Sequence, residues 1–474
     1  MPVFRYQQLS DELRHGIQTG RWQAGEKLPS IRALCRLYQL SLATVQHALH
    51  RLEAEGLLQA VAKTGYFVCK TATTQAITTA KVRSATPAQL AEPAAVTVPQ
   101  LWFELMNRGA AFDLYPAGPS STLPYLTLLY RQLGKAMRAS PYQNAMYYDE
   151  PAGSAQLRFQ LKEHYRTVGL ELDAAELVIS AGCQHALFLA LSACCQPGDT
   201  VAVEAPAFYG VLQLLQQLQL KALPIPCCPV DGLDVTALSQ ALFQWPIKAC
   251  VVSPAFATPT GACLPLPARH ALIALANQYD FTLIEDDIYG DLGFHQRPLP
   301  LKSLDTEQRV ILCSSFTKSL SRDLRVGWIA AGKWQPAVLK LKLVSQLASS
   351  PALQQGIAAF MAEGYYKRHL LKFRQQLQQQ RDQLIQALQQ HFPADCQYSI
   401  PNGGLALWLQ LPQPSDTVAL YQQCLAHGIY LTPGRMFATN PQFDHCLRLS
   451  FAHPLTGSRL QALQQVAALL PNSS

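Results

Sequence analysis

The chain contains 474 residues, of which 49% are hydrophobic and 15% charged, so it can bury the cores of roughly three compact units. This composition excludes an intrinsically disordered protein, and the 26 Gly and 32 Pro are too few and too scattered for a fibrous chain. The net charge is +7, and residues 1–70 supply +4 of it, from nine Lys and Arg against five Asp and Glu. This asymmetry indicates contact with a polyanion near the N-terminus.

The N-terminal residues and the cysteines indicate which cellular compartment to expect. The first residues contain no apolar segment typical of a secretory signal, and the longest apolar stretch, Ala186–Cys195, is far shorter than a membrane span. The 13 cysteines include the adjacent pairs Cys194–Cys195 and Cys227–Cys228, which fit neither a metal motif nor a disulfide framework. We therefore expect a soluble, cytoplasmic protein without membrane contact or a metal site, whose cysteines are small core residues.

The first 70 residues show three helical patterns followed by two short strands. Apolar residues recur at helical spacing from Leu9, after Ser30 and after Ser41, and both serines are suited to cap the helix that follows. Residues 57–62 and 66–68 are expected to form a hairpin. This order predicts a winged helix-turn-helix domain over residues 1–70.

The third helix of such a domain enters the major groove of DNA. Its first two turns present five side chains away from the apolar face, where they are placed to read bases: Leu42, Ala43, Thr44, Gln46 and His47. Candidate phosphate contacts are the side chains of Arg32, Arg36 and Lys63 and the helix amides behind Ser30 and Ser41. Spacing alone leaves a second interpretation open, in which the helix-turn-helix serves only packing or dimerisation.

A linker is expected to follow this domain. Of the 30 residues 71–100, 18 are Thr, Ala or Pro, and neither helical nor strand periodicity is sustained. Such a segment cannot bury enough surface to fold alone. We expect a flexible linker over residues 71–104.

Beyond the linker, short apolar runs alternate with helical patterns, as in a largely parallel α/β sheet covered by helices. The expected strands are Leu177–Ser180, Thr200–Glu204, Ala249–Ser253, Thr282–Glu285, Val310–Cys313 and Gly327–Ala330. From about Leu339 the chain reads as helical, and Arg374–Gln390 is expected to form one long solvated helix. Residues Leu405–Leu411 and Cys446–Phe451 add strands of a smaller domain. We expect a large domain over residues 105–335 and a small one over residues 336–474.

Lys318 is the candidate for a chemically employed amine, because it follows a buried strand. A buried ammonium is costly unless it is paired or used, and one use is a Schiff base with an aldehyde such as pyridoxal phosphate. Asp286 could pair with the pyridine nitrogen, and Phe208 could stack on the ring. Candidate phosphate donors are Ser315, Thr317, Arg325 and the helix N-terminus at Gly182, Cys183 and Gln184.

Each of these residues, taken singly, also fits a plain structural role, with Lys318 reaching solvent and Asp286 capping a turn. As a set at the strand ends of one α/β sheet, where ligands bind in such folds, they indicate a cofactor site.

Residues 4–69 closely resemble the GntR-type winged helix domain, including its block Gly20–Arg32. The resemblance implies that DNA is contacted by Arg32, by the first turns of the third helix at Leu42, Thr44 and Gln46, and by the wing at Thr64 and Gly65. The family usually has arginine where this chain has Leu42 and Gln46. Each lost phosphate contact lowers salt-sensitive affinity, so binding is expected to depend on dimer avidity and on Gln and Thr base contacts.

Residues from about 111 to 470 resemble a fold-type I aminotransferase. The matching blocks are Tyr148–Gly153, Ser180–Gln184, Pro197–Asp199, Pro259–Gly261, Glu285–Tyr289, Ser314–Trp328, Gly403–Leu409 and Leu447–Phe451. The resemblance implies that Lys318 carries the Schiff base, Arg325 binds the phosphate and Asp286 pairs with the pyridine nitrogen. It also implies that Tyr289 bonds the phenolic oxygen of the cofactor and that Arg448 pairs with an amino-acid carboxylate.

One position departs from the aminotransferase pattern. The usual Asn-Pro-Thr-Gly is Thr258-Pro259-Thr260-Gly261 here. Threonine can still hydrogen-bond but is shorter than asparagine, so we expect cofactor binding to survive and transaminase chemistry to be compromised.

The order of the two resemblances, with a linker between them, is similar to that of the MocR subfamily of bacterial transcriptional regulators. It implies a homodimer that binds a double-stranded DNA operator and senses an amino acid, another amine or pyridoxal phosphate itself through the Schiff base at Lys318. The alternatives are an active aminotransferase with an appended DNA-binding domain and a cofactor-binding scaffold without DNA contact, which the intact GntR block disfavours.

Overall fold

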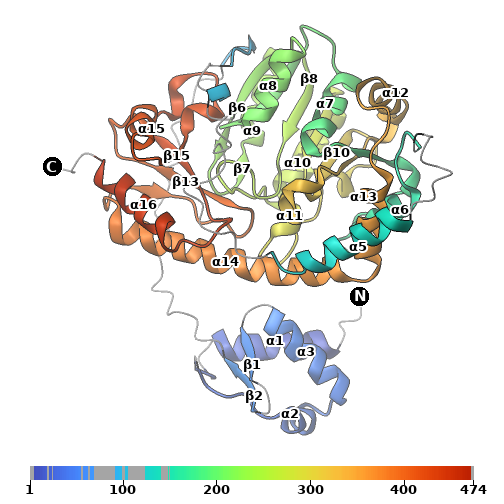
Figure 1. Ribbon diagram of the computed structural model, residues 1–474, viewed down its shortest axis with the longest axis vertical. Helices are drawn as coiled ribbons and strands as arrows, with labels where there is room; N and C mark the ends of the chain where they lie inside the picture. Colours follow the sequence, from blue (N-terminus) through green and yellow to red (C-terminus); the bar gives the residue numbers. More distant parts are fainter. Residues whose placement is uncertain are drawn as a thin grey trace. The chain divides into compact units, whose positions relative to one another are not determined.

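The computed structural model describes residues 5–18, 21–23, 25–54, 57–61, 64–68, 91–98, 102–104, 123–139, 148 and 150–470. The chain divides into two compact units, unit 1 over Met1–Lys81 and unit 2 over Val82–Ser474 (Figure 1). Within the described residues, no helix combines the length and the apolar character needed to cross a membrane.

The described residues of unit 1 form three helices and a two-stranded antiparallel sheet, as predicted. The elements are α1 (Arg5–Gln18), α2 (Ile31–Tyr38), α3 (Leu42–Ala54), β1 (Leu58–Val61) and β2 (Gly65–Val68). Leu13, Leu34, Val45 and Leu49 are fully buried between the helices, so unit 1 has an apolar core of its own. Lys63, at the expected turn of the hairpin, lies outside the described residues.

Unit 2 is built on a large sheet with the strand order β3-β6-β5-β8-β9-β10-β11-β4 and β7 paired to β6. Its strands are β3 (Ala94–Ala95), β4 (Leu177–Ser180), β5 (Thr200–Ala205), β6 (Lys221–Cys228), β7 (Gly232–Leu233), β8 (Ile247–Val252), β9 (Thr282–Asp286), β10 (Val310–Ser315) and β11 (Gly327–Ala330). The five strands β6, β5, β8, β9 and β10 are parallel, whereas β11 is antiparallel to both β10 and β4. The six predicted strands are confirmed.

Helices cover both faces of this sheet. The helices named here are α5 (Leu126–Ala139), α6 (Ala155–Arg166), α7 (Cys183–Cys194), α8 (Tyr209–Gln217), α9 (Val235–Gln244) and α10 (Leu266–Tyr279). Successive residues of β5 enter different apolar clusters: Val201 and Val203 belong to the cluster that contains Leu187 of α7, and Ala202 belongs to the cluster that contains Leu272 of α10. This alternation places α7 and α10 on opposite faces, which explains why the strands are apolar throughout.

The linker expected over residues 71–104 was placed too far toward the C-terminus. Ala94 and Ala95 form β3 and pair with β6, and the backbone N–H of Val98 donates to Gln216 Oε1 over 2.7 Å. Trp102 is only 1% exposed and belongs to the main apolar cluster of unit 2. Burial of these apolar residues outweighs the Thr, Ala and Pro composition, so residues 94–98 and 102 are part of unit 2.

The C-terminal part of unit 2 combines helices with a four-stranded antiparallel sheet. Its elements are α12 (Gln335–Ser345), α13 (Pro351–Ala362), α14 (Tyr365–His391), β12 (Gln397–Tyr398), β13 (Ala406–Gln410), α15 (Thr417–Leu425), β14 (Thr432–Pro433), β15 (Cys446–Ser450) and α16 (Ser458–Ala468). The long helix expected over Arg374–Gln390 is confirmed as part of α14, but α14 buries one face that includes Phe373, Leu377, Leu384 and Leu388, so the helix is not solvated all round. Figure 1 shows α14 running along one edge of unit 2. Only its glutamine-rich outer face is solvated.

Candidate functional site

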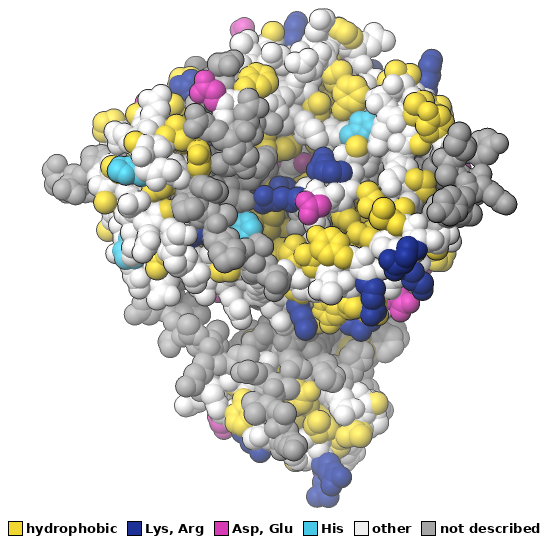
Figure 2. All heavy atoms as spheres, in the orientation of Figure 1, with side chains coloured by type: hydrophobic (Ala, Val, Ile, Leu, Met, Phe, Trp, Pro, Cys, Tyr) yellow, Lys and Arg dark blue, Asp and Glu magenta, His cyan; other side chains and the backbone are white. Residues whose placement is uncertain are grey.

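The residues predicted to hold a cofactor come together at one edge of the large sheet. Because β4, β5, β8, β9 and β10 run in the same direction, their carboxyl ends meet at that edge. Gly182 follows β4, Phe208 follows β5, Thr258 follows β8, Asp286 ends β9 and Lys318 follows β10. In the view of Figure 2, Lys and Arg side chains gather near the centre of unit 2.

Asp286 is a buried carboxylate held by two donors. Its side chain is 4% exposed, and Oδ1 accepts hydrogen bonds from Cys183 Sγ and from the backbone N–H of Ile288, each over 3.2 Å. Burial raises the pKa of Asp286 to about 6, while these hydrogen bonds and the charge of Lys318 act in the opposite direction. Burial also raises the pKa of the Cys183 thiol well above its usual value, so the thiol stays protonated and can donate. Asp286 is therefore suited to pair with a protonated ring nitrogen.

An anion-binding corner lies at the start of α7. Gly182 caps α7 with a φ of 95° and no side-chain hydrogen bond, so the first backbone N–H groups of the helix face outward. Arg325 lies against this turn and donates from Nη2 to the carbonyl of Ala181 over 3.1 Å. A Cβ at Gly182 would come within 2.7 Å of Arg325 Nη2, so glycine is required for this close approach.

Lys318 lies in the short helix α11 (Phe316–Ser319), which begins directly after β10. Ser315 caps α11 by accepting a hydrogen bond from the backbone N–H of Thr317 over 3.3 Å. Thr317 Oγ1 in turn accepts from Arg325 Nη1 over 3.3 Å. Lys318 is half-buried and close enough to Asp286 to influence its pKa. The predicted lysine, carboxylate and arginine thus belong to one site.

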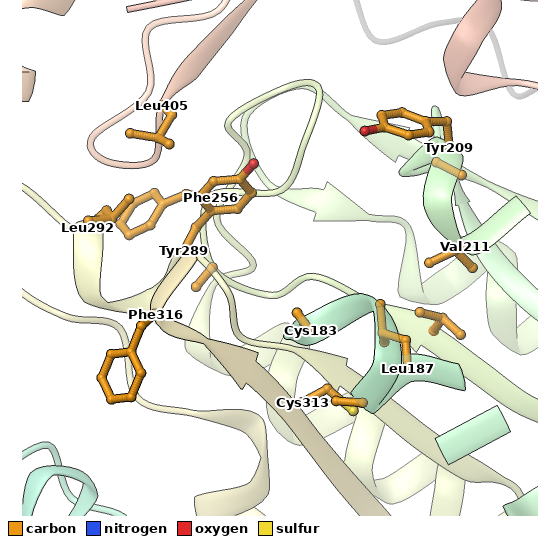
Figure 3. Packing of buried hydrophobic residues seen from close by; sticks show 14 of the residues in the cluster. Cys183, Leu187, Tyr209, Val211, Phe256, Tyr289, Leu292, Cys313, Phe316 and Leu405 are labelled. Carbon is orange, nitrogen blue, oxygen red and sulfur yellow. The ribbon is translucent and has the colours of Figure 1, made fainter. Parts of the chain in front are cut away.

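Thr258 connects Tyr289 with Arg448. Arg448 is 5% exposed in β15 and donates from Nε to Thr258 Oγ1 over 3.2 Å. Thr258 also hydrogen-bonds the side chain of Tyr289. Burial raises the pKa of Tyr289, and the charge of Arg448 opposes the rise. Figure 3 shows Tyr289 and Tyr209 reaching from different elements into the region above Cys183.

Two predicted residues have a structural role as well. Gln184 Nε2 donates to the carbonyl of Gly210 over 2.8 Å, so this side chain joins α7 to α8, and only the backbone of Gln184 is left for an anion. Phe208 is half-buried and packs edge-on against Tyr209, with 4.7 Å between the ring centroids. A side chain at position 210 would collide with both Phe208 and Gln184, so Gly210 is needed to bring the ring close to the site.

A buried ionic network behind α11 escaped the sequence analysis. Asp291 accepts hydrogen bonds from Arg297 Nε over 2.7 Å and from the Tyr366 hydroxyl over 2.8 Å, and lies 2.9 Å from His164 Nε2. Burial alone would raise the pKa of Asp291, but His164 and Arg297 hold it well below its usual value. The Tyr366 hydroxyl is also 2.9 Å from Ser319 Oγ, next to Lys318, so the network connects α14 to α11. In the sequence, only two acidic residues indicate this network: Asp287, within the block Glu285–Tyr289, and Asp291.

The candidate DNA-contacting residues of unit 1 include helix-capping serines, exposed side chains and residues that the structure does not describe. Ser30 caps α2 by accepting from the backbone N–H of Ala33, and Ser41 caps α3 by accepting from that of Thr44. The side chains of Arg32, Leu42, Gln46 and Thr64 are exposed, and Gly65 begins β2 with a φ of 128°. The side chain of His47 and the whole of Lys63 lie outside the described residues.

The comparisons agree with both domains. The family described as bacterial regulatory proteins of the gntR family matches residues 5–68, and the family described as aminotransferase class I and II matches residues 125–464. The chain therefore combines a GntR-type helix-turn-helix domain with an aminotransferase-like α/β domain. It belongs to the family of HTH-type transcriptional regulators with this architecture, the MocR subfamily.

Relatives and solved structures cover most of the chain. The uncharacterized HTH-type transcriptional regulators YdcR and YjiR of Escherichia coli (strain K12) are 35% and 33% identical, over 98% of this chain and 99% and 98% of their own lengths. The crystal structure of LysN, an alpha-aminoadipate aminotransferase from Thermus thermophilus complexed with N-(5'-phosphopyridoxyl)-L-leucine, is 25% identical. It superposes with a TM-score of 0.70 over 78% of this chain and 94% of that one.

Pyridoxal phosphate is the cofactor that this fold and these neighbours support, and the residues present fit it. A buried carboxylate stands ready for the ring nitrogen at Asp286, and an open helix N-terminus beside Arg325 is suited to a phosphate. Lys318 supplies an amine at the end of the adjacent strand.

Proposed function

We propose that this protein is a transcriptional regulator that binds DNA through unit 1 and senses an amino acid, another amine or pyridoxal phosphate through unit 2. The observation that supports this proposal best is the combination, in one chain, of a helix-turn-helix with the site formed by Lys318, Asp286 and Arg325. The same site without unit 1 would indicate an enzyme alone.

The residues of unit 2 divide the work of holding the cofactor. When bound, pyridoxal phosphate supplies an aldehyde that condenses with amines and a ring that withdraws electrons from them. Lys318 offers the protein amine, Asp286 holds a proton on the ring nitrogen, and Arg325 with the first turn of α7 binds the phosphate. Phe208 packs against the ring, Tyr289 donates toward its phenolic oxygen, and Thr258 supports Tyr289 through the hydrogen bond between their side chains.

Arg448 is proposed to bind the carboxylate of an amino-acid effector. A guanidinium can pair two carboxylate oxygens at once, and Thr258 fixes its orientation. The effector can change DNA binding only if the protein has two conformations that bind the effector with unequal affinity. We propose a homodimer, because two copies of unit 1 on one operator provide the avidity that single copies lack.

The assignment of Lys318 is tested by trapping. Reduction of the purified full-length protein with borohydride should fix the cofactor covalently on Lys318, and peptide mapping should locate it there. Lys318→Ala should lose this link, whereas Lys302→Ala, which changes another buried lysine of unit 2, should keep it. Trapping on another lysine would refute the assignment, and equal operator binding with and without amines and cofactor would refute the sensor function.

An active aminotransferase with an appended DNA-binding domain is the second candidate. The observation in its favour is that the site keeps a lysine, a carboxylate and two arginines, and Thr258 retains a hydrogen bond to Tyr289. Against it stands threonine in place of the asparagine of the aminotransferase pattern. Conversion of an amino acid to its oxoacid by the purified protein, lost in Lys318→Ala, would support this candidate.

A further inference from the structure

The outer face of α3 carries an exposed leucine and an exposed glutamine one helical turn apart. Val45, Ala48, Leu49 and Leu52 form the fully buried face of the helix. Leu42 is 54% exposed in the first turn, and Gln46, four residues later, is also exposed. Side chains at i and i+4 lie on the same side of a helix, about 6 Å apart. Leu42 and Gln46 therefore face outward together, across a span of about two base-pair steps.

The chemistry of this face excludes two common modes of base recognition. Residues 42–49 contain no Lys, Arg, Asp or Glu, so the first two turns of α3 can offer neither an arginine to guanine nor a carboxylate to cytosine. Thr44 is already engaged, because its hydroxyl lies 2.8 Å from Ser41 Oγ in the cap of the helix. Among the described side chains of these two turns that are exposed and larger than the methyl group of Ala43, an apolar branched side chain and a primary amide remain.

These two groups match the edges of A·T pairs in the major groove. Thymine alone presents a C5-methyl group there, and adenine presents an acceptor at N7 beside a donor at N6, which a glutamine side chain can bond together. A single exposed leucine is ordinary on a protein surface. At the first turn of a recognition helix, however, it lies where base edges are read. We propose that Leu42 recognises a thymine methyl group and Gln46 recognises an adenine within about two base pairs of it.

Two exposed cations of unit 1 lie on α2 and are suited to position α3 rather than to read bases. Arg32 and Arg36 are exposed on α2, four residues apart, and Ser30 caps the same helix. Phosphate contacts of this kind fix register without sequence information. Specificity at the two positions therefore depends on Leu42 and Gln46, and this inference rests on the proposed DNA binding of unit 1.

Base analogues that delete one atom group each provide the test. The operator is first selected from random duplex DNA with the full-length protein. Each thymine is then replaced by deoxyuridine, which lacks only the methyl group, and each adenine by 7-deazaadenine, which lacks the N7 acceptor. One thymine replacement should weaken binding about fourfold in the wild type and not in Leu42→Ala. One adenine replacement should weaken it at least about fivefold in the wild type and not in Gln46→Ala.

Matched variants separate base reading from other effects. Leu37→Ala removes a leucine of α2 that is 60% exposed and should keep both analogue penalties. Arg32→Ala should weaken binding to all sequences alike and also keep both penalties. Leu42→Arg should change the preferred base pair at its position from A·T to G·C.

The outcomes distinguish this inference from the proposed function. Penalties that persist unchanged in Leu42→Ala and Gln46→Ala, or G·C pairs selected at both positions by the wild type, would overturn the inference while DNA binding stands. Failure to select or bind any DNA would overturn the proposed function, and this inference with it.

Discussion

Arg448 Nε donates a hydrogen bond to Thr258 Oγ1 over 3.2 Å. Arg448 lies in β15 of the four-stranded sheet, and Thr258 follows β8 of the large sheet, so this contact joins the two parts of unit 2 at the candidate site. Because Thr258 also bonds Tyr289, one hydroxyl orients two residues of the site. The threonine that replaces the usual asparagine is therefore engaged with the residue proposed to select the effector.

Replacement of Thr258 by valine tests this orienting role. Thr258→Val keeps the shape of the side chain but leaves Arg448 Nε without its acceptor in a buried place, which costs about 1–3 kcal/mol. Amino-acid binding, measured by calorimetry on the full-length protein, should weaken about tenfold. Thr258→Ser keeps the hydroxyl and should bind nearly as the wild type does. Wild-type affinity in Thr258→Val, together with weakening in Thr258→Ser, would show that the methyl group, not the hydroxyl, matters.

Arg448→Lys tests the carboxylate contact itself. Lysine keeps the charge but cannot form two parallel hydrogen bonds with a carboxylate. The affinity for amino-acid effectors should fall by about 2–3 kcal/mol, while cofactor absorbance and DNA binding stay nearly unchanged. If Arg448 only holds the two parts of unit 2 together, the variant should lose thermal stability and cofactor at the same time. Simple amines without a carboxylate serve as the control ligands, since their affinity should not change.

The strands that sequence reasoning found are those with uninterrupted apolar runs, such as β4 and β9. Strand β6 was missed because Pro224 and Pro226 interrupt its pattern, yet both positions pair with β5 in the sheet. The end of the linker was misplaced because Val98 and Trp102 are spaced apolar residues in a polar segment, and only the sheet edge and the main core give them partners.

Within the site, motif spacing was sufficient to place Lys318, Asp286 and Arg325 together, because Asp286 ends β9, Lys318 follows β10 and Arg325 precedes the antiparallel β11 at the same edge of the sheet. Side-chain directions were not predictable in the same way. The thiol of Cys183 bonds Asp286, 103 residues away in the chain, through the packing of α7 against β9. The bond between Tyr366 and Asp291 likewise depends on where α14 crosses the unit, which no local pattern determines.

Unit 1 alone should bind the operator much more weakly than the full-length protein. Its apolar core indicates that residues 1–81 can fold. We propose that unit 2 supplies the contacts of the homodimer, so the isolated unit should bind as a monomer. Loss of the second, linked DNA contact should lower affinity by about 10²- to 10⁴-fold in a titration of labelled operator. A fusion of residues 1–81 to an unrelated dimeric protein is the control and should restore much of the affinity. Equal affinity of isolated unit 1 and the full chain would contradict the dimer.

Removal of the Cys183 thiol should change the pH dependence of cofactor binding. The carboxylate form of Asp286 is needed to pair with a protonated ring nitrogen, and the hydrogen bond from Cys183 favours that form. In Cys183→Ala the pKa of Asp286 should rise above its value of about 6, so cofactor affinity should begin to fall at a higher pH as the solution is acidified. Cys183→Ser keeps a donor and should resemble the wild type. Equilibrium dialysis of pyridoxal phosphate against the cofactor-free protein over a pH series measures the shift, and identical profiles for all three proteins would exclude the role.

Glu204 should make unit 2 less stable as the pH rises. It lies near the end of β5, where its carboxyl oxygen Oε2 accepts a hydrogen bond from the backbone N–H of Ser253, and burial raises its pKa from 4.5 to about 8. Between these values the folded chain keeps a proton that the unfolded chain has lost, so the free energy of unfolding falls with increasing pH, by at most about 5 kcal/mol over the whole interval.

Glu204 contributes most of this effect between pH 7 and pH 8. Glu285 and Asp286, with pKa values of about 7 and about 6, titrate mainly at lower pH, and burial raises the pKa of Asp287 as well. In Glu204→Gln the side chain stays neutral, so the loss of stability between pH 7 and pH 8 should largely disappear. The measurement is urea unfolding of the cofactor-free protein at several pH values, with the exposed Glu171→Gln as the control that should retain the slope. A slope in Glu204→Gln equal to that of the wild type would show that Glu204 is already ionised in the folded protein.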